Sequence, residues 1–464
     1  MQKDVEPSDL GSSILNPDNP DVLTKVANLY HNWYVGEDDN IKLLFLALLT
    51  KNLRRENRLH VIVTGESSSG KSFLVNTILK ALPFGGYIHL TRFTSAYLER
   101  LEESLDGQIL FYEQYDGHIS KQGPDPFSTL KFVLSEGKLT LGVVEENELG
   151  KKHSANKEVQ GMPVFISTSV RVDIDPETLN RVIITSIDES EDQTLRILSY
   201  ESKLASNPIL AAKGENVKHQ LFSLVKQYSD AAKEVYDIAI PFADKLISLM
   251  PLKDVKIRRD FNKIINLTKV VAFAHYPLRK TVRLVIPPLN KEKKIVVSTP
   301  DDFREAMDIG NKAFRQTLHN LSTKAMAIHE QALKLLDNSN EDGIKIKDIS
   351  KNTGYSLSRA RELMNQLENM GYWVHEKEGR ENIYQPTPKK FNELDLSSIN
   401  FSEEELNAWR ATYFADADII EPGESFSVEK VEKVTSVETE PQNTPITQIE
   451  HKSDSSIKYD ATKN

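Results

Sequence analysis

The sequence predicts an α/β fold in which helices cover a parallel sheet, followed by a small second unit. Between His60 and about Ile187, short apolar runs alternate with stretches of helical periodicity. The runs are continuous, which is typical of strands buried on both faces of a parallel sheet. A glycine-rich loop, GESSSGKS over residues 65–72, follows the first run and precedes a helix. A loop of this pattern between a strand and a helix is typical of phosphate binding.

Length and composition set the outer limits of the prediction. At 464 residues the chain is too long for one core, so two or three domains are expected. The net charge of −10 does not exclude nucleic acid, because the distribution of charge matters more than its sum. The chain has no cysteine, which excludes disulfides, zinc fingers and thiol catalysis. No apolar run is long enough to span a membrane, so a cytoplasmic chain without a membrane partner is expected.

Two helices are predicted ahead of the phosphate loop. Apolar positions recur at helical spacing in VLTKVANLYHNWYV, which begins at Val22, and in NIKLLFLALLTKNL, which begins at Asn40. The buried runs that follow predict the strands of the sheet: HVIVT, YIHL, QILFYE, PVFISTS and NRVIITSID. The first twenty residues have no periodicity and are expected to form a flexible arm.

The loop supplies the groups that a nucleotide's phosphates require. Its glycines let successive backbone N–H groups face the phosphates, Lys71 supplies a positive charge, and Ser72 is a ligand for Mg²⁺. The Asn-Lys-x-Asp run that reads guanine is absent, which favours ATP. The ATP-binding residues predicted are Gly65, Glu66, Ser67, Ser68, Ser69, Gly70, Lys71 and Ser72.

A second strand, QILFYEQYDG, ends in a carboxylate where many ATPases place Asp-Glu. Here the pair is Glu113-Gln114. If Glu113 takes the Asp position near Mg²⁺, Gln114 takes the position of the base, and an amide is a poor proton acceptor. If Glu113 is the base, Tyr112 replaces the Asp, and Ser72 holds the metal with less help, although Asp116 could assist. Glu113 is therefore predicted as a catalytic and metal-site residue.

Two further residues separate a ring motor from a kinase or a switch. A motor needs a polar residue at the tip of the strand between the phosphate loop and the acidic strand, and PVFISTSVR offers Thr168 to orient water. It also needs an arginine that reaches a neighbouring subunit's nucleotide, and DPETLNRVIITSIDES offers Arg181.

In their order, these motifs resemble AAA+ ATPases, in the branch that contains minichromosome maintenance helicases and the helicase modules of plasmid and phage primases. The resemblance runs from about Asp21 to Glu330. It includes an inserted β-hairpin, LSEGKLTLGVVEENELGKKHSANKEVQGM, before the strand that carries Thr168, and a lid that starts at IRRDF. The lid arginine of the family corresponds to Arg259, with Arg258 as the alternative. The chain departs from the family in its Glu-Gln pair and in having only a short arm where relatives carry a DNA-gripping or primase domain.

The resemblance implies a homo-oligomeric ring, usually a hexamer, with ATP between neighbouring subunits. In such a ring Arg181 and Arg259 would complete the site in trans, and Lys151 and Lys152 at the hairpin tip would track one DNA strand. Positive residues at a loop tip contact phosphates without reading sequence.

Residues 343–390 have the pattern of a winged helix: a helix, a turn at Gly354, a second helix capped by Ser356, and two strand-like runs. The segment has nine Lys or Arg against six Asp or Glu, and is basic within an acidic chain. The predicted core residues are Ile349, Leu357, Leu363 and Leu367. The predicted DNA contacts are Arg359 and Arg361 on the second helix, and Lys377 and Arg380 in the wing.

The predicted fold is thus an α/β P-loop AAA+ parallel sheet with a helical lid, a small winged-helix domain and a disordered tail. The lid is expected to contain one hairpin, TVRLVIPPLNKEKKIVVST. The parts are a flexible arm (1–20), the core with its leading helices (21–190), the lid (191–336), the winged helix (337–390), a helical segment (391–417) and an acidic tail (418–464).

The expected function is an ATP-dependent DNA translocase or helicase of a replication system. Its partners would be single-stranded or forked DNA and a primase or polymerase, and its cofactor would be Mg²⁺. The rival interpretation is an ATP-switched DNA-binding loader or regulator with slow hydrolysis, which Gln114 favours.

Overall fold

A computed structural model describes most of the chain between residues 21 and 422. The described residues are 21–83, 85–91, 97–98, 101, 103–114, 126–146, 152–170, 180–207, 209, 214–250, 252, 257–286, 291–311, 313–314, 323–339, 343–378, 381–388, 399–415 and 417–422. The predicted flexible arm, Asp116, Lys151, Arg380 and the bend of the lid hairpin lie outside them.

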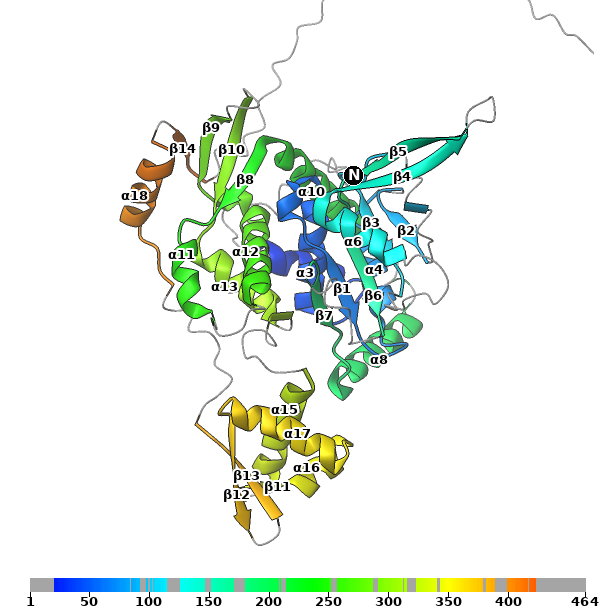
Figure 1. Cartoon of the computed structure of the whole chain (residues 1–464), viewed down its shortest axis with the longest axis vertical. Coiled ribbons are helices and arrows are strands. Elements are labelled where there is room, and N and C mark those ends of the chain that lie inside the picture. The colour runs from blue at the N-terminus through cyan, green and yellow to red at the C-terminus, as the bar shows by residue number, and fades with distance from the viewer. Residues whose placement is uncertain are drawn as a thin grey trace, which may run out of the picture. The chain divides into compact units, whose positions relative to one another are not determined.

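The predicted parallel sheet is present, with the strand order β2-β3-β6-β1-β7 (Figure 1). Its strands are β1 (Val61–Thr64), β2 (Ile88–Leu90), β3 (Ile109–Tyr112), β6 (Val164–Ser169) and β7 (Ile183–Ser186). All neighbouring pairs run parallel, and β1 and β6 are buried along their whole length. Because β6 lies between β1 and β3, its end stands between the phosphate loop and the acidic strand, as predicted.

Four helices pack against this sheet or lead into it: α2 (Val22–Tyr30), α3 (Asp38–Leu49), α4 (Lys71–Leu79) and α6 (Pro126–Glu136). Helix α2 starts where Asp21 accepts a hydrogen bond from the Thr24 N–H, 3.0 Å away. Helix α3 is buried almost all round, since nine of its twelve residues are inaccessible to solvent. Two 3-10 turns, η1 (Thr50–Asn52) and η2 (Arg55–Asn57), join α3 to β1.

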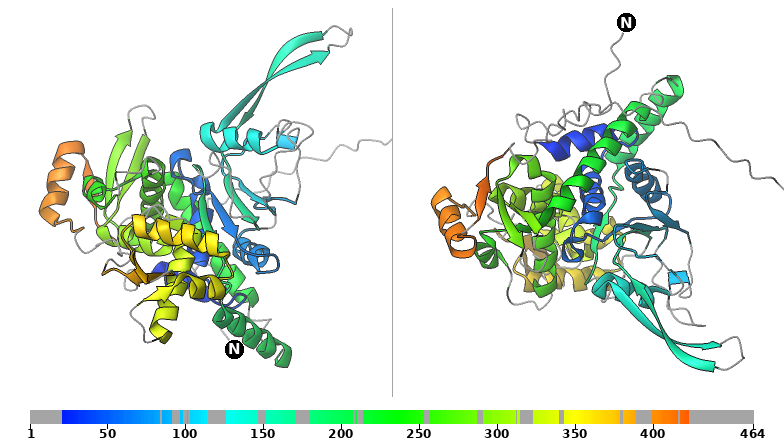
Figure 2. Two further views of the ribbon diagram at one scale, coloured as in Figure 1. Left: turned by 60° about the horizontal axis from the view of Figure 1, so that its bottom comes forward. Right: turned by 90° about the horizontal axis from the view of Figure 1, so that it is seen from above.

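The inserted hairpin consists of β4 (Lys138–Glu146) and β5 (Lys152–Gln160). The two strands pair antiparallel in register from Lys138 with Gln160 to Glu146 with Lys152. They form a separate two-stranded ribbon that extends beyond α6 (Figure 2). At the root of the ribbon, Leu139 and Val159 join a small apolar cluster with Val133 of α6.

The segment predicted as the lid contains strands of a mixed sheet as well as the predicted helices. Its helices and 3-10 turns are α8 (Glu191–Ser206), α10 (Gly214–Glu234), α11 (Ala243–Leu246), η3 (Ile247–Leu249), α12 (Ile257–Ala274), η4 (Tyr276–Leu278) and α13 (Pro300–Ile309). The sheet has the order β14-β9-β10-β8, from β8 (Val235–Ala239), β9 (Thr281–Ile286), β10 (Lys291–Val297) and β14 (Asp418–Ile420). Buried residues of α10, α12 and α13 share one apolar core with α2, α3 and β1.

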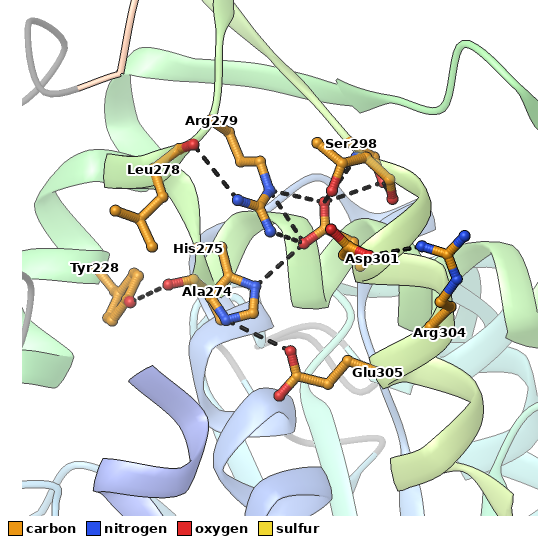
Figure 3. A network of polar contacts seen from close by, with 11 residues as sticks. Tyr228, Ala274, His275, Leu278, Arg279, Ser298, Asp301, Arg304 and Glu305 are labelled. Atoms are coloured by element: carbon orange, nitrogen blue, oxygen red, sulfur yellow. Dashed lines mark hydrogen bonds and ion pairs between the residues drawn. The ribbon is translucent and has the colours of Figure 1, made fainter. Parts of the chain in front are cut away.

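A buried polar network holds the end of α12 to the start of α13 (Figure 3). Asp302 is fully buried and accepts hydrogen bonds from Arg279 and from His275 Nδ1, which is 3.1 Å away. The same carboxylate caps α13 through the Thr299 N–H at 2.8 Å. Burial alone would raise the pKa of Asp302, but the bonds from His275 and Arg279 lower that pKa to about 2. The network is therefore held together by a carboxylate that stays ionised inside the lid.

A small unit with its own core follows the lid. It contains α15 (Thr323–Ser339), β11 (Ile344–Lys345), α16 (Ile346–Thr353), α17 (Leu357–Asn369), β12 (Trp373–Glu378) and β13 (Glu381–Pro386). The strands form an antiparallel sheet of order β11-β13-β12. Helix α17 starts as predicted, with the Ser356 hydroxyl accepting from the Arg359 N–H at 3.3 Å.

The core of this unit differs from the prediction at one position. Leu363 and Leu367 are fully buried, but Leu357 is 41% exposed, so its assignment to the core is wrong. As the first residue of α17, Leu357 lies beside the cap, on the exposed end of the helix. Trp373 fills the core instead, and its indole N–H donates to His329 Nδ1 of α15 at 2.7 Å. Helix α15 thus belongs to this core, although all but its last three residues fall within the predicted lid.

The chain returns to the lid after the small unit. Helix α18 (Glu403–Tyr413) has a capping box at Ser402, and Leu406 on its inner face joins an apolar cluster with Val282 of β9. Strand β14 then pairs antiparallel with β9 from Asp418 to Ile420, within the segment assigned to the tail. Both ends of the small unit are therefore attached to lid segments.

Candidate functional site

The phosphate loop has the backbone that its sequence predicts. It joins the buried strand β1 to α4, and both Ser68 (φ 66°) and Gly70 (φ 92°) adopt the left-handed conformation. Glycine adopts this conformation at little cost, whereas a serine pays for it. A side chain at Gly65 would come within 2.8 Å of a Glu189 carboxylate oxygen and 2.9 Å of the Ser69 hydroxyl. The loop therefore curls tightly, with no room for a larger residue at its start.

Lys71 is held inside this loop. Its ammonium donates to the Gly65 carbonyl at 3.0 Å, to the Glu66 carbonyl, and to Ser69 Oγ at 3.3 Å. The residue is only 7% exposed, and burial lowers its pKa while the nearby charge of Glu189 raises it. A buried cation that contacts only neutral oxygens of its own loop fits an anionic ligand, because phosphate oxygens offer it a stronger partner.

Glu189 is a residue of this site that the sequence did not identify. It follows β7, and its Oε1 accepts a hydrogen bond from the Glu66 N–H at 2.5 Å. A phosphate bound to the loop would compete with this carboxylate for the same N–H. Only its place just beyond a buried strand, next to the Ser190 cap of α8, marks it in the sequence.

The acidic strand ends at the same edge of the sheet. Glu113 directly follows β3, and its Oε1 lies 3.2 Å from His89 Nε2 on the neighbouring strand β2. The His89 ring stacks on Phe111 with centroids 4.8 Å apart, which fixes its orientation. The next residue, Gln114, is left-handed at φ 61°. Glu113 is therefore the carboxylate at the end of this strand, and a left-handed turn follows it.

Thr168 contacts the acidic turn directly. Its Oγ1 accepts a hydrogen bond from the Gln114 N–H at 3.1 Å, and the residue is 2% exposed. The adjacent Ser167 hydroxyl donates to the Tyr112 carbonyl at 2.6 Å. On the other side of β6, the Gly65 N–H donates to the Ser169 carbonyl at 3.2 Å. The end of β6 therefore joins the phosphate loop to the Glu113-Gln114 turn, and the hydroxyl hydrogen of Thr168 remains to be donated.

The predicted arginines lie on other elements. Arg181 precedes β7 and donates through Nε to Ser135 Oγ of α6. Arg258 and Arg259 occupy the first turn of α12, where Arg258 is exposed and Arg259 half-buried. Their predicted role concerns a neighbouring subunit's nucleotide and stays a prediction.

The predicted DNA contacts fall on two separate parts of the chain. Lys152 is the first residue of β5, next to the hairpin tip. In the small unit, Arg359 pairs with Glu362 at 2.6 Å, while Arg361 on α17 and Lys377 on β12 are exposed. These three positive residues lie on the recognition-helix and wing positions of the sequence pattern.

An aromatic pair lies beside the phosphate loop. Phe73 of α4 is 54% exposed and stacks on Tyr34, with centroids 5.6 Å apart. The Tyr34 hydroxyl would lie 3.3 Å from a side chain at Gly70.

Two further findings limit the site. Among the described residues, no three His, Asp or Glu side chains gather as a ready metal site. Magnesium that is held largely by nucleotide phosphates needs only one or two protein ligands, and the assignment of Ser72 and Glu113 to this role stays a prediction. No helix within the described ranges is both long and apolar enough to cross a membrane.

Comparison with known proteins finds similarity to a P-loop domain. A family model described as the MTBMA_p00010 P-loop domain matches residues 12–234. The uncharacterized protein MTBMA_p00010 of Methanothermobacter marburgensis is 22% identical over 315 residues, or 64% of this chain. The matched region makes up 35% of that protein, so the chain spans about a third of the relative's length.

A solved structure is also similar, with a lower sequence identity than the relative above. It is the crystal structure of a full-length MCM homolog from Methanopyrus kandleri, with 15% identity and a TM-score of 0.42. The similarity covers 68% of this chain and 63% of the other. The family match, the five-stranded parallel sheet and the phosphate loop agree on an α/β P-loop domain that binds nucleotide.

Proposed function

We propose that the chain is an ATP-dependent DNA translocase or helicase of a replication system, which hydrolyses ATP at the subunit interfaces of a homo-oligomeric ring. The observation that carries the proposal is the edge of the sheet at β6. There Thr168 and Ser169 connect the phosphate loop to Glu113-Gln114, and the projecting hairpin is inserted between β3 and β6. The nucleotide site and a projecting arm are thus joined through the same two strands.

In this proposal each residue of the edge has a separate task. The N–H groups of residues 65–72 and the Lys71 ammonium would bind the phosphates, and Ser72 would hold Mg²⁺. Glu113 accepts the proton of the attacking water, and Thr168 orients that water. Bound Mg²⁺ would add positive charge beside the phosphate oxygens.

The ring supplies the remaining groups of the site. Arg181 and Arg259 of a neighbouring subunit would contact the terminal phosphate, where positive charge stabilises the transition state of phosphoryl transfer. A head-to-tail interface of this kind closes into a ring when its rotation permits, and we propose six subunits.

DNA binding is divided between the hairpin and the small unit, which we propose is a winged helix. Lys151 and Lys152 would contact the backbone of one strand, and Arg361 would approach a duplex from α17 with Arg359, Lys377 and Arg380. A replication primase or polymerase is the partner that such an activity requires, and the cytoplasm is the proposed location.

The test is ATP hydrolysis by the full chain with and without forked DNA, together with unwinding of the fork. We expect DNA to stimulate hydrolysis and the Arg361→Ala variant to bind DNA more weakly. Lys334→Ala is a matched control, because Lys334 is an exposed cation on α15 of the same unit. If the rate of ATP hydrolysis is the same with and without DNA in the wild type and in both variants, the result would contradict the proposal.

A second candidate is an ATP-switched loader or regulator with slow hydrolysis. Gln114 favours it, because an amide next to Glu113 cannot accept a proton if the carboxylate is used for the metal. Single-turnover hydrolysis by wild type and Glu113→Gln separates the candidates. A helicase requires a large loss in the variant, and a slow switch gives two similarly low rates.

A further inference from the structure

The two strands of the hairpin meet at their root through two glycines, and neither position has space for a side chain. Gly137 precedes β4 with φ 61°, Gly161 follows β5 with φ 99°, and the Gly161 N–H donates to the Gly137 carbonyl at 2.9 Å. A side chain at Gly137 would lie 2.7 Å from Arg55 Nη1, and one at Gly161 would lie 2.3 Å from the Asp106 nitrogen. One end of the ribbon therefore lies against Arg55, and the other end lies against Asp106.

Those two residues belong to an ionic cluster centred on Asp106. Its carboxylate accepts from Arg55 Nη2 at 2.5 Å, from Arg58 Nη1 at 2.7 Å, and from the Met162 N–H at 3.1 Å. Burial alone would raise the pKa of Asp106, but the hydrogen bonds from Arg55 and Arg58 hold that pKa well below its usual range. Met162 directly follows Gly161, so the cluster grips the chain where it leaves β5.

The same cluster is attached to the lid. Arg55 begins the 3-10 turn η2, and the next residue, Glu56, accepts through its carbonyl from Asn266 of α12 at 2.7 Å. The third residue of the turn, Asn57, donates to Asp237 of β8 at 2.8 Å. Asp237 also pairs with Lys269 of α12 at 3.1 Å. The turn η2 therefore contacts the hairpin root on one side and α12 on the other.

We infer that Asp106 is a positioning residue that fixes the hairpin root to η2, so that a displacement of lid helix α12 is passed to the hairpin. This inference rests on the proposed function, since it gives the hairpin's position a role in contacting DNA. An ionised carboxylate that gathers two guanidinium groups and a backbone N–H holds three chain segments in one geometry. The hairpin has no other sheet partner among the described strands, so its direction depends on this root.

The first measurement concerns the hairpin alone and needs no DNA. The chain has no cysteine, so Val144→Cys, at a position that is 70% exposed on β4, gives a unique site for a nitroxide label. Paired with a second label at Leu195→Cys on α8, which is 64% exposed, it reports a distance distribution by pulsed electron paramagnetic resonance. We expect Asp106→Asn to broaden this distribution clearly, and an unchanged distribution would overturn the inference.

The control is Glu158→Gln. Glu158 pairs with Lys138 at 2.7 Å, and its side chain is 38% exposed, against 37% for Asp106. The pair joins the two hairpin strands to each other and not to the core, so its loss should leave the distribution as in wild type. If Asp106→Asn does not fold, the same distance measurement is made on Arg55→Lys, which keeps the ion pair between Arg58 and Asp106. The distribution should again be broader than in wild type.

The second measurement separates positioning from general damage. With Asp106→Asn we expect an unchanged KM for ATP and unchanged hydrolysis without DNA, but about a tenfold higher DNA concentration for half-maximal stimulation. Equal DNA dependence in wild type and variant would contradict the coupling. If wild type shows no DNA stimulation, the proposed function fails, and the label distances still decide whether Asp106 fixes the hairpin.

Discussion

Replacing Thr168 tests how the nucleotide edge is built. Thr168→Val keeps the shape of the side chain but removes the oxygen that accepts from the Gln114 N–H at 3.1 Å. A lost hydrogen bond of this kind costs about 1 kcal/mol, which slows hydrolysis about fivefold if the whole cost falls on the transition state. The left-handed turn at Gln114 would then lose the bond that holds it, and Glu113 would lose its position.

Loss of the proposed contact between Thr168 and the attacking water would slow hydrolysis further, beyond the roughly fivefold effect of the lost hydrogen bond. Removing a group that orients the nucleophile costs about 10²-fold or more, so the two contributions can be separated by size. The assay is single-turnover hydrolysis at saturating ATP, with Thr168→Ser as the control that keeps the hydroxyl. We expect a loss well above fivefold for Val and little loss for Ser. A Val variant that hydrolyses ATP at the wild-type rate would refute the reasoning.

Three further predictions follow from the same contacts. Lys71→Ala should abolish detectable ATP binding in calorimetry, because the loop loses its only buried cation, and near-normal affinity would contradict the site. Glu113→Gln should lower single-turnover hydrolysis about 10²- to 10⁴-fold with ATP affinity retained, since the variant keeps the shape but cannot accept a proton. Asp302→Asn should destabilise the lid by about 3 kcal/mol or more in urea unfolding at pH 7, because His275 and Arg279 lose their buried partner. The folded pKa of Asp302 is about 2 against an ordinary 3.8, so its ionisation contributes about 2 kcal/mol above pH 4, lost as the pH falls towards 2. If the free energy of unfolding of the wild type does not fall between pH 4 and pH 2, the result would contradict the proposed role of the network.

Local patterns were enough to predict the parallel sheet and the phosphate loop. Buried parallel strands appear as continuous apolar runs, and the GESSSGKS pattern has one usual place between a strand and a helix. The position of Thr168 followed from the strand order, because the end of β6 lies between β1 and β3. The apolar runs and the loop are patterns within a few consecutive residues, and the place of Thr168 depends only on the order of the strands in the sheet.

The contacts that the sequence did not reveal join distant segments. Glu189 meets Glu66 across 123 positions, and Asp106 meets Arg55 across 51. Neither carboxylate has a local pattern that distinguishes it from an exposed one. Leu357 was misplaced for a related reason, since helical spacing identifies a face but not which end of it is covered. The same limit hid α15 from the small unit, because its partners in that core, such as Trp373 for His329, lie far along the chain.

The central claim is that two neighbouring subunits complete each nucleotide site, and a mixing experiment tests it most directly. Lys71→Ala and Arg181→Ala subunits should each hydrolyse ATP very slowly when assayed alone. In a 1:1 mixture, an intact site needs Lys71 from one subunit and Arg181 from its neighbour. Random assembly makes about one quarter of the sites intact (½ × ½), so we predict about a quarter of wild-type hydrolysis for the mixture. A mixture no more active than its two components would contradict the claim, because Arg181 would then act within its own chain or not at all.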